Sequence, residues 1–220
     1  MRTTDSPLVL TAVLAAVAAL SLNAAPARAA GSGPVSTPSM PAAERTPEDL
    51  AKETYNDGVR LVKKADKAGA SDKAADSYTK AQGKFQAALD LAPDMYQAWN
   101  YLGYTRRKLG DFAGALSAYD RALALNPKYA EAIEYRGHAY LGLNRLDDAK
   151  QAYLALFADH RKLAAQLLDG MKSWVAARRA APDGVDAQAI DELSKWVDER
   201  SQLAMTTAAL TREGSDASWR

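Results

Sequence analysis

A period of 34 residues runs through the middle of this chain. Pro93 recurs as Pro127, and Ala81 recurs as Ala115 and Ala149. The same spacing relates four more sets of positions: Phe85, Tyr119 and Tyr153; Tyr78, Phe112 and Leu146; Gly103 and Gly137; Trp99 and Ile133. A fixed period of this length indicates stacked helical hairpins, and such stacks usually bind other proteins. No segment alternates apolar and polar residues as a half-buried strand would, so the sequence predicts an all-α fold.

The unit over residues 96–129 carries the pattern most completely. Gly103 and Ala115 are small where the two helices of a hairpin must approach closely. At residues 109–111, a leucine, a glycine and an aspartate are expected to end one helix and begin the next. Pro127 follows the second helix because proline cannot continue it. Large apolar side chains are expected to fill the space between helices: Trp99, Leu102, Phe112 and Tyr119.

These residues resemble the tetratricopeptide repeat (TPR), a helix–turn–helix unit of 34 residues. The resemblance covers three units, residues 47–95, 96–129 and 130–160. It implies a short right-handed solenoid of helical hairpins, in which the first helix of each hairpin lines a concave groove. It also implies that the partner is a protein or a peptide.

The two outer units depart from the pattern. The third unit has Asn144 where the second has a glycine, and asparagine also tolerates the left-handed conformation. That unit lacks a closing proline, so its helix either continues or turns differently into the C-terminal segment. The first unit has about 11 extra residues within 64–77, since Gly58 and Ala81 are 23 positions apart and their equivalents are 12 apart. We expect this insert to be either a lengthened hairpin tip or a loop.

Residues 1–29 have the features of a secretory signal peptide. Arg2 precedes an uncharged run of 15 residues, Leu8 to Leu22, and residues 27–29 (Ala-Arg-Ala) match a small-x-small cleavage site. The run is short for a membrane span, which takes about 20 apolar residues. We therefore expect an exported bacterial protein in the periplasm, with an uncleaved, membrane-tethering signal anchor as the alternative. The chain has no cysteine, which excludes disulfides and thiolate metal sites.

The segments on either side of the repeats have different compositions. Residues 30–46 are rich in proline, serine, glycine and alanine and predict a disordered linker. Thr46 and Pro47 then predict a helix start. Residues 161–208 predict capping helices that cover the last repeat, and residues 209–220 predict a flexible tail. The residues expected to face inward in the capping helices are Leu163, Leu167, Met171, Trp174, Val175, Ile190, Leu193, Trp196, Val197, Leu203 and Ala204.

The composition offers little for catalysis or nucleic-acid binding. The 28 basic and 27 acidic residues nearly balance, so the chain has no general attraction to nucleic acid. There is no glycine-rich phosphate loop, no nucleophile elbow and no pair of histidines at the spacing of a zinc site. We expect no catalytic residue, no metal and no cofactor.

The basic cluster of residues 106–108 is interpreted as the cationic end of a helix. His160 is expected at a helix junction. An enzyme or small-ligand protein that uses His138, Glu134 and Asn100 is a minor alternative.

Helical periodicity selects the residues of the first helices that packing does not need, and these form the candidate binding groove. They are Lys52, Tyr55, Asn56 and Lys63 in the first unit, Gln97, Asn100, Tyr101, Tyr104, Arg107 and Lys108 in the second, and Glu131, Glu134, Tyr135 and His138 in the third. Tyrosine, asparagine and arginine together are typical of a recognition surface. The alternative for each tyrosine is that it only packs between repeats.

One known binding mode of the family is absent from the sequence. Some TPR proteins clamp the C-terminal carboxylate of a chaperone with two Lys/Arg and two Asn residues. The corresponding positions here hold Tyr55, Val59, Tyr101, Glu131 and Tyr135, so the resemblance does not extend to that clamp.

The sequence therefore predicts a non-enzymatic adaptor for a protein or peptide partner of mixed charge. The alternative is a self-associating module that uses Trp196, Trp219 or an exposed end of the solenoid.

Overall fold

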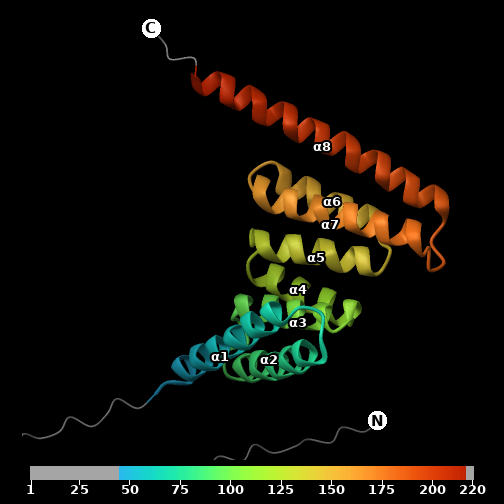
Figure 1. The fold of residues 1–220 in the computed structure, drawn as a ribbon. Coiled ribbons are helices and arrows are strands. Elements are labelled where there is room, and N and C mark those ends of the chain that lie inside the picture. Colours follow the sequence, from blue (N-terminus) through green and yellow to red (C-terminus); the bar gives the residue numbers. More distant parts are fainter. Residues whose placement is uncertain (1–44, 217–220) are drawn as a thin grey trace, which may run out of the picture. The chain divides into compact units, whose positions relative to one another are not determined.

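The computed structural model describes residues 45–216, which form α-helices joined by short turns (Figure 1). The predicted signal peptide, nearly all of the predicted linker and Trp219 lie outside these residues. The described range contains no strand, and its helices are α1 (Pro47–Ala68), α2 (Asp72–Leu91), α3 (Tyr96–Lys108), α4 (Phe112–Leu125), α5 (Ala130–Gly142), α6 (Leu146–Phe157), α7 (Arg161–Ala180) and α8 (Ala187–Asp216). Each odd-numbered helix packs against the even-numbered helix that follows it. The predicted all-α stack of hairpins is confirmed.

The first hairpin is longer than the next because the insert is helical. Helices α1 and α2 contain 22 and 20 residues, whereas α3 and α4 contain 13 and 14. Only residues 69–71 separate α1 from α2, and Gly69 has a φ of 64°. Of the two conformations that the sequence left open, the lengthened hairpin tip is therefore correct. The insert is rich in alanine and lysine, which are strong helix formers, on both sides of Gly69.

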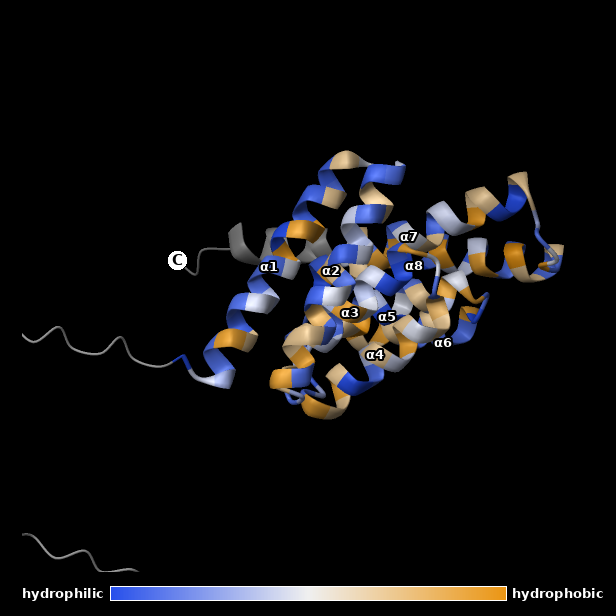
Figure 2. Ribbon diagram, turned by 90° about the horizontal axis from the view of Figure 1, so that it is seen from below, coloured by the Kyte–Doolittle hydropathy of each residue, from blue (hydrophilic) through white to orange (hydrophobic). Residues whose placement is uncertain are grey.

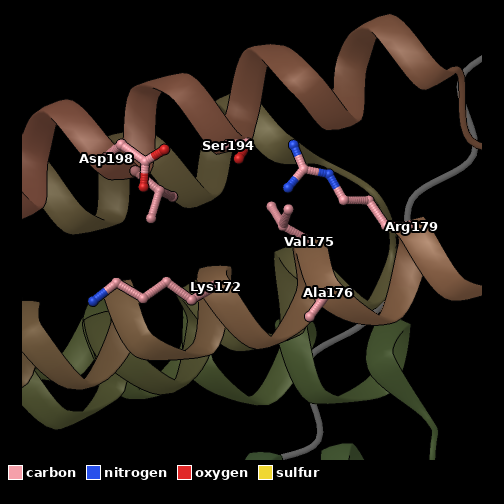
Figure 3. Close-up of a pocket in the computed structure, with 7 residues that line it drawn as sticks. Lys172, Val175, Ala176, Arg179, Ser194 and Asp198 are labelled. Carbon is pink, nitrogen blue, oxygen red and sulfur yellow. The ribbon is translucent and has the colours of Figure 1, made fainter.

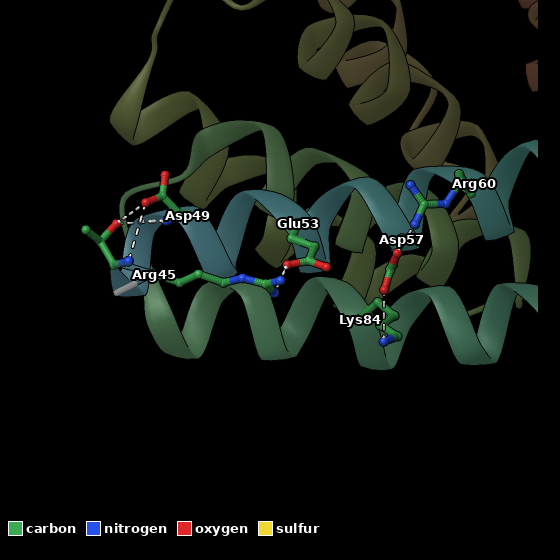
Figure 4. Close-up of polar contacts among 7 residues, drawn as sticks. Arg45, Asp49, Glu53, Asp57, Arg60 and Lys84 are labelled. Carbon is green, nitrogen blue, oxygen red and sulfur yellow. Dashed lines mark hydrogen bonds and ion pairs between the residues drawn. The ribbon is translucent and has the colours of Figure 1, made fainter. Parts of the chain in front are cut away.

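The predicted helix start at Thr46 is confirmed as a reciprocal cap. The backbone N–H of Asp49 donates to the Thr46 hydroxyl at 3.1 Å, and the backbone N–H of Thr46 donates to the Asp49 carboxylate at 3.3 Å. The hydrogen bonds from the Thr46 side chain and backbone lower the pKa of Asp49. Figure 4 shows this cap and the ion pairs that follow it on the first hairpin: Arg45 with Glu53, and Asp57 with both Arg60 and Lys84.

The turns of the next two hairpins are built alike, as the sequence predicted. Gly110 follows α3 with a φ of 85°, and Asn144 occupies the equivalent place after α5 with a φ of 56°. Asp111 then caps α4, because its carboxylate accepts a hydrogen bond of 2.8 Å from the backbone N–H of Gly114. The third unit ends in a turn at residues 158–160, so its second helix does not continue into α7.

The two C-terminal helices form a further hairpin on the last repeat. Most residues expected to face inward in it are buried: Leu167, Met171, Trp174, Val175, Ile190, Leu193 and Val197. Leu203 is an exception, since 43 % of its surface is exposed. Helix α8 also ends at Asp216 rather than near residue 208. Residues 208–210 (Ala-Ala-Leu) are strong helix formers. In Figure 1 the C-terminal end of α8 extends past α7.

The core follows the 34-residue period through the stack. Phe85 and Tyr119 are completely buried and lie against Gly58 and Gly103, respectively. In the third unit, Gly137 is instead covered by Leu167 of α7, so α7 completes the packing of the last repeat. Figure 2 shows apolar and polar residues interspersed along the helices, as expected where each helix buries one face. Within the described part of the chain, no helix has the length and apolar character required to cross a bilayer.

Candidate functional site

Four half-buried tyrosines form a connected series across the first helices of the three repeats. Tyr55 on α1 contacts Tyr101 on α3, with ring centroids 5.7 Å apart. Tyr101 contacts Tyr104 at 6.4 Å, and Tyr104 contacts Tyr135 on α5 at 5.1 Å. We call Tyr55, Tyr101, Tyr104 and Tyr135 the tyrosine row. The structure thus brings candidates from all three units together at one place, where their rings also pack between repeats.

The base of the row is fixed by buried rings. Phe85 of α2, which is fully buried, stacks on Tyr101 at 5.2 Å and contacts Tyr55 at 5.8 Å. Tyr119 of α4, also fully buried, contacts Tyr135 at 6.3 Å. Because these rings cannot move into solvent, the exposed edges of the row are held in place before any partner arrives.

Asp66, in the helical insert, ties the first hairpin to the row. Its Oδ1 accepts a hydrogen bond of 2.6 Å from the Tyr78 hydroxyl and one of 2.7 Å from the Tyr104 hydroxyl. Burial is the largest cause that raises the pKa of both tyrosines, and the hydrogen bond to Asp66 is the second largest. The insert therefore contributes directly to the site, which the repeat pattern alone did not predict.

Two cations at the end of α3 lie over the rings. The Arg107 guanidinium is 5.2 Å from the Tyr104 centroid and 5.7 Å from that of Tyr135. The Lys108 ammonium is 5.4 Å from the Tyr78 centroid and 5.9 Å from that of Tyr104. Residues 106–108 do form the cationic last turn of α3, as predicted. Within residues 45–216, neither Arg107 nor Lys108 forms an ion pair with a carboxylate, and the buried Nε of Arg107 has no acceptor.

Three hydroxyls of the tyrosine row have no hydrogen-bond partner within the described residues: those of Tyr55, Tyr101 and Tyr135. Burial is the largest cause that raises the pKa of Tyr55 and of Tyr135 to about 12, and it also raises the pKa of Tyr101. These groups are therefore neutral hydroxyls at physiological pH. They can donate hydrogen bonds to a bound molecule.

Two of the candidate groove residues are not accessible. Asn100 is 1 % exposed and Glu134 is 6 % exposed, so neither side chain can line an open groove. The periodicity placed both residues among the groove candidates, but the structure buries their side chains. Asn100 Oδ1 has no hydrogen-bond partner.

His138 contacts Glu134 through a hydrogen bond of 2.8 Å between Nε2 and Oε1. The imidazole lies against Gly170 of α7, where an added Cβ would stand 2.2 Å from His138 Cε1. Asn100 bonds to neither residue. The structure thus brings together two of the three residues of the minor enzymatic alternative, and places them in the packing between α5 and α7.

The remaining candidates are spread over other surfaces. Lys52 and Gln97 line a separate pocket of about 290 Å³ near the starts of α1 and α3. Lys63 lies with three other cations of α1, namely Arg60, Lys64 and Lys67. Asn56 and Glu131 are exposed, and Glu131 is close enough to Tyr129 to help burial raise the pKa of that tyrosine. His160 is exposed at the junction of α6 and α7, as predicted.

Sequence reasoning missed Asp66 and Tyr78. Asp66 lies in the insert, which has no counterpart in the other units, so no periodic signal marks it. Tyr78 was recognised only as a packing position of the period. The Tyr96–Tyr129 ring pair, with centroids 4.9 Å apart, was also missed, although its 33-residue separation is close to the period.

A second pocket, of about 200 Å³, lies between α7 and α8 (Figure 3). Its lining includes Lys172, Arg179 and Asp198, but the two cations already pair with Asp169 and Asp191. It contains no arrangement of nucleophile and base. In the described range there is also no group of three or more His, Asp or Glu residues placed to hold a metal ion.

Comparison with known proteins identifies the repeats. Residues 96–129 and residues 118–151 match family models that are both described as the tetratricopeptide repeat. The two matched segments together span residues 96–151, from the start of α3 to the middle of α6. The insert-bearing first hairpin lies outside both matches.

The chain is also similar to one curated protein and to two solved domains. The Hsp70-Hsp90 organizing protein of Triticum aestivum is 32% identical over 150 residues, which cover 66% of this chain and 26% of that protein. The chain thus spans about a quarter of the length of this curated relative. The Arabidopsis OM64 TPR domain aligns with a TM-score of 0.49 and 17% identity, covering 58% of this chain and 98% of the domain. The first TPR domain of the human RPAP3 protein aligns with a TM-score of 0.49 and 22% identity, covering 61% of this chain and 98% of that domain.

Proposed function

We propose that this chain is a non-enzymatic adaptor that binds an extended segment of a protein partner across the first helices of its repeats. The tyrosine row carries the proposal. It combines rigid half-buried rings, unpaired hydroxyl donors and two cations without carboxylate partners, which is the composition of energetically important positions in interfaces. The name of the curated wheat relative, which describes it as organizing two other proteins, supports an adaptor role.

We also propose that the adaptor works in the bacterial cell envelope, most directly in the periplasm. The support for this setting is the sequence of residues 1–29, with its short apolar run and its small-x-small site. Fractionation of cells that produce the protein, with N-terminal sequencing of the purified chain, tests the setting. A chain that keeps residues 1–29 and stays in the cytoplasmic fraction would overturn it.

Affinity capture with matched variants tests the role of the groove. The immobilised protein is exposed to an envelope extract, and the captured partner is quantified for the parent and for the variants Tyr104→Ala and Arg107→Ala. We expect each variant to lower capture about tenfold, in the range of interface residues of this kind. Tyr140→Ala is the control, because Tyr140 is a half-buried tyrosine of α5 that contacts Arg136 and Arg145 instead of the row.

Circular dichroism establishes that each variant is folded before its capture is compared. Equal capture by the parent and both groove variants would show that the partner binds elsewhere. If Tyr140→Ala lowered the amount of captured partner as much as the two groove variants do, this would also show that the tyrosine row is not the specific binding site.

Self-association is a second candidate function, favoured by two exposed apolar side chains of α8. Leu203 and Met205 expose 43 % and 65 % of their surface. Exposed apolar side chains on one helix are a common basis for contacts between copies. Light scattering at micromolar concentration would detect a dimer, and Leu203→Asp with Met205→Asp should dissociate it. Leu154→Asp on α6, where Leu154 is 43 % exposed, is the control. A monomer at all concentrations tested would remove this candidate.

A further inference from the structure

We propose that the tyrosine row binds a proline-rich partner segment in the polyproline II conformation, with an acidic side chain of that segment held by Arg107 and Lys108. The inference rests on the proposed function and names the class of ligand at the same site.

The hydrogen-bonding groups of the row select among the conformations that a bound segment can adopt. Tyr55, Tyr101 and Tyr135 present hydroxyl donors without partners. A bound α-helix uses its own carbonyls internally and offers few acceptors to them. A bound β-strand needs the edge of a sheet, and residues 45–216 contain no strand. A polyproline II segment has no internal hydrogen bonds, so all its carbonyls are free to accept from the hydroxyls.

The rings favour the same conformation. Successive contacts of 5.7, 6.4 and 5.1 Å make the row a continuous series of aromatic rings, with neighbouring rings tilted by 75°, 62° and 52°. Proline rings pack flat on aromatic faces, and a polyproline II segment is already extended, so it loses little entropy on binding. The row crosses from α1 to α5, roughly two helix spacings of about 8–10 Å. At about 3.1 Å per residue, five or six residues of the ligand cover it.

The charges around the row place the acidic residue. Arg107 lies against Tyr104 and Tyr135, and Lys108 lies over Tyr78, while Asp66 is the carboxylate that accepts from the tyrosine hydroxyls. The buried carboxylate of Glu134 also lies near Tyr135 but bonds to His138, whereas Arg107 and Lys108 form no ion pair within the described residues. An acidic side chain of the ligand can therefore pair with these two cations, and the stacking of Arg107 means that little side-chain entropy is lost when the ion pair forms.

Glu131 lies on α5, four residues before Tyr135, and its exposed carboxylate helps to raise the pKa of Tyr101, after burial and Asp66, and that of Tyr129. An acidic side chain of the ligand would be repelled by Glu131, which favours its placement beside Arg107 and Lys108.

Fluorescence polarisation with synthetic peptides tests the proposal. The probe is a fluorescein-labelled peptide of eight prolines with two glutamates at one end, amidated at its C-terminus and made in both orders. We expect one order to bind saturably. A peptide with two lysines in place of the glutamates, and one with glycine and serine in place of the prolines, should each bind at least about tenfold more weakly.

Variants of the protein assign the contacts. Tyr101→Phe and Tyr135→Phe keep the rings and remove the donors, and each should weaken the glutamate peptide by about two- to tenfold. Arg107→Gln should weaken the glutamate peptide by about tenfold and abolish its preference over the lysine peptide. Tyr140→Phe, outside the row, should change nothing.

Several results would overturn the inference. They are equal binding of the proline and the glycine–serine peptides, no binding of any peptide at millimolar concentration, and unchanged affinity in the Tyr101→Phe, Tyr135→Phe and Arg107→Gln variants. Displacement of the probe by a peptide of residues 31–44, which contain Pro34, Pro38 and Pro41, would make this chain's own segment the occupant instead of a partner. If the peptides fail while Arg107→Ala still lowers partner capture, the ligand class is wrong and the proposed function stands.

Discussion

The ring of Tyr119 lies so close to Gly103 that a Cβ at position 103 would stand 2.5 Å from Tyr119 Cε1. Because Tyr119 is completely buried, its ring has no free space into which it can shift. We therefore predict that Gly103→Ala destabilises the protein by about 1–3 kcal/mol, the usual effect of overpacking a core. Urea denaturation followed by circular dichroism measures this change.

Gly83→Ala is the matched control for that substitution. Gly83 lies in the interior of α2, and no atom would come within 4 Å of its added Cβ. This variant should be more stable than the parent by about 0.5–1 kcal/mol, because alanine favours the helix over glycine. If Gly103→Ala destabilises the protein and Gly83→Ala stabilises it, close packing against Tyr119 explains why position 103 requires glycine. Stabilisation by both substitutions would contradict that explanation.

The contact between Gly103 and Tyr119 also shows what could be predicted from the sequence. Interactions that repeat with the period, or that lie within a few residues of each other, were predicted correctly. Examples are the small residue at Gly103, the cap at Thr46 and the left-handed turn at Asn144. Each depends on local geometry that the residue types determine.

The incorrect or missing predictions concern contacts that have no period. Asp66 reaches Tyr104 across 38 positions of the sequence, from an insert that occurs once. Helical periodicity placed Glu134 on the groove face, but its side chain is buried and bonds to His138, which packs against Gly170 of α7. Leu203 continued an apolar stripe along α8, beyond the part of that helix that α7 covers. Such outcomes depend on the relative lengths of neighbouring helices, which no single segment encodes.

The turn after α5 provides a second test of stability. Asn144 adopts a φ of 56°, a conformation that glycine adopts freely, and Gly110 does so at the equivalent turn with a φ of 85°. We predict that Asn144→Gly stabilises the protein by up to about 1 kcal/mol, and that Asn144→Val destabilises it by about 1–2 kcal/mol. Thermal denaturation of both variants and the parent measures their order of stability. A valine variant as stable as the glycine variant would show that the turn changes its conformation.

Asp66 should stabilise the contact between the insert and the row. In Asp66→Ala, the Tyr78 and Tyr104 hydroxyls lose their shared acceptor, and we predict a loss of about 1–2 kcal/mol. Asp66→Asn keeps an Oδ1 acceptor and should lose less than half as much. Asp76→Ala, which removes only an exposed ion pair with Lys80, should change stability by less than about 0.5 kcal/mol. An effect of Asp66→Ala no larger than that of Asp76→Ala would mean that water replaces the carboxylate without loss.

The His138–Glu134 hydrogen bond should contribute to the packing of α5 against α7. In His138→Ala, the buried carboxylate of Glu134 loses its partner, which should destabilise the protein by about 1–3 kcal/mol. Adding Glu134→Gln to that variant removes the unpaired charge and should restore part of the loss. A double-mutant cycle by urea denaturation measures the coupling between the two residues. If the effects of the two substitutions simply add, the hydrogen bond does not stabilise the fold.

The tyrosine row should make stability depend on pH only in the alkaline range. Burial raises the pKa of Tyr55 and of Tyr135 from 10.0 to about 12, so folding favours the protonated hydroxyls. Below pH 10 these groups are protonated in both the folded and the unfolded chain, and their stabilising contribution is fully present. Between about pH 10 and 12, the unfolded chain releases protons that the folded chain retains, so the free energy of unfolding falls as the pH rises. Urea midpoints across this range, together with the ultraviolet absorbance of tyrosinate, measure the effect. The variant with both Tyr55→Phe and Tyr135→Phe should show a shallower decline, and an identical decline would show that these two tyrosines do not cause it.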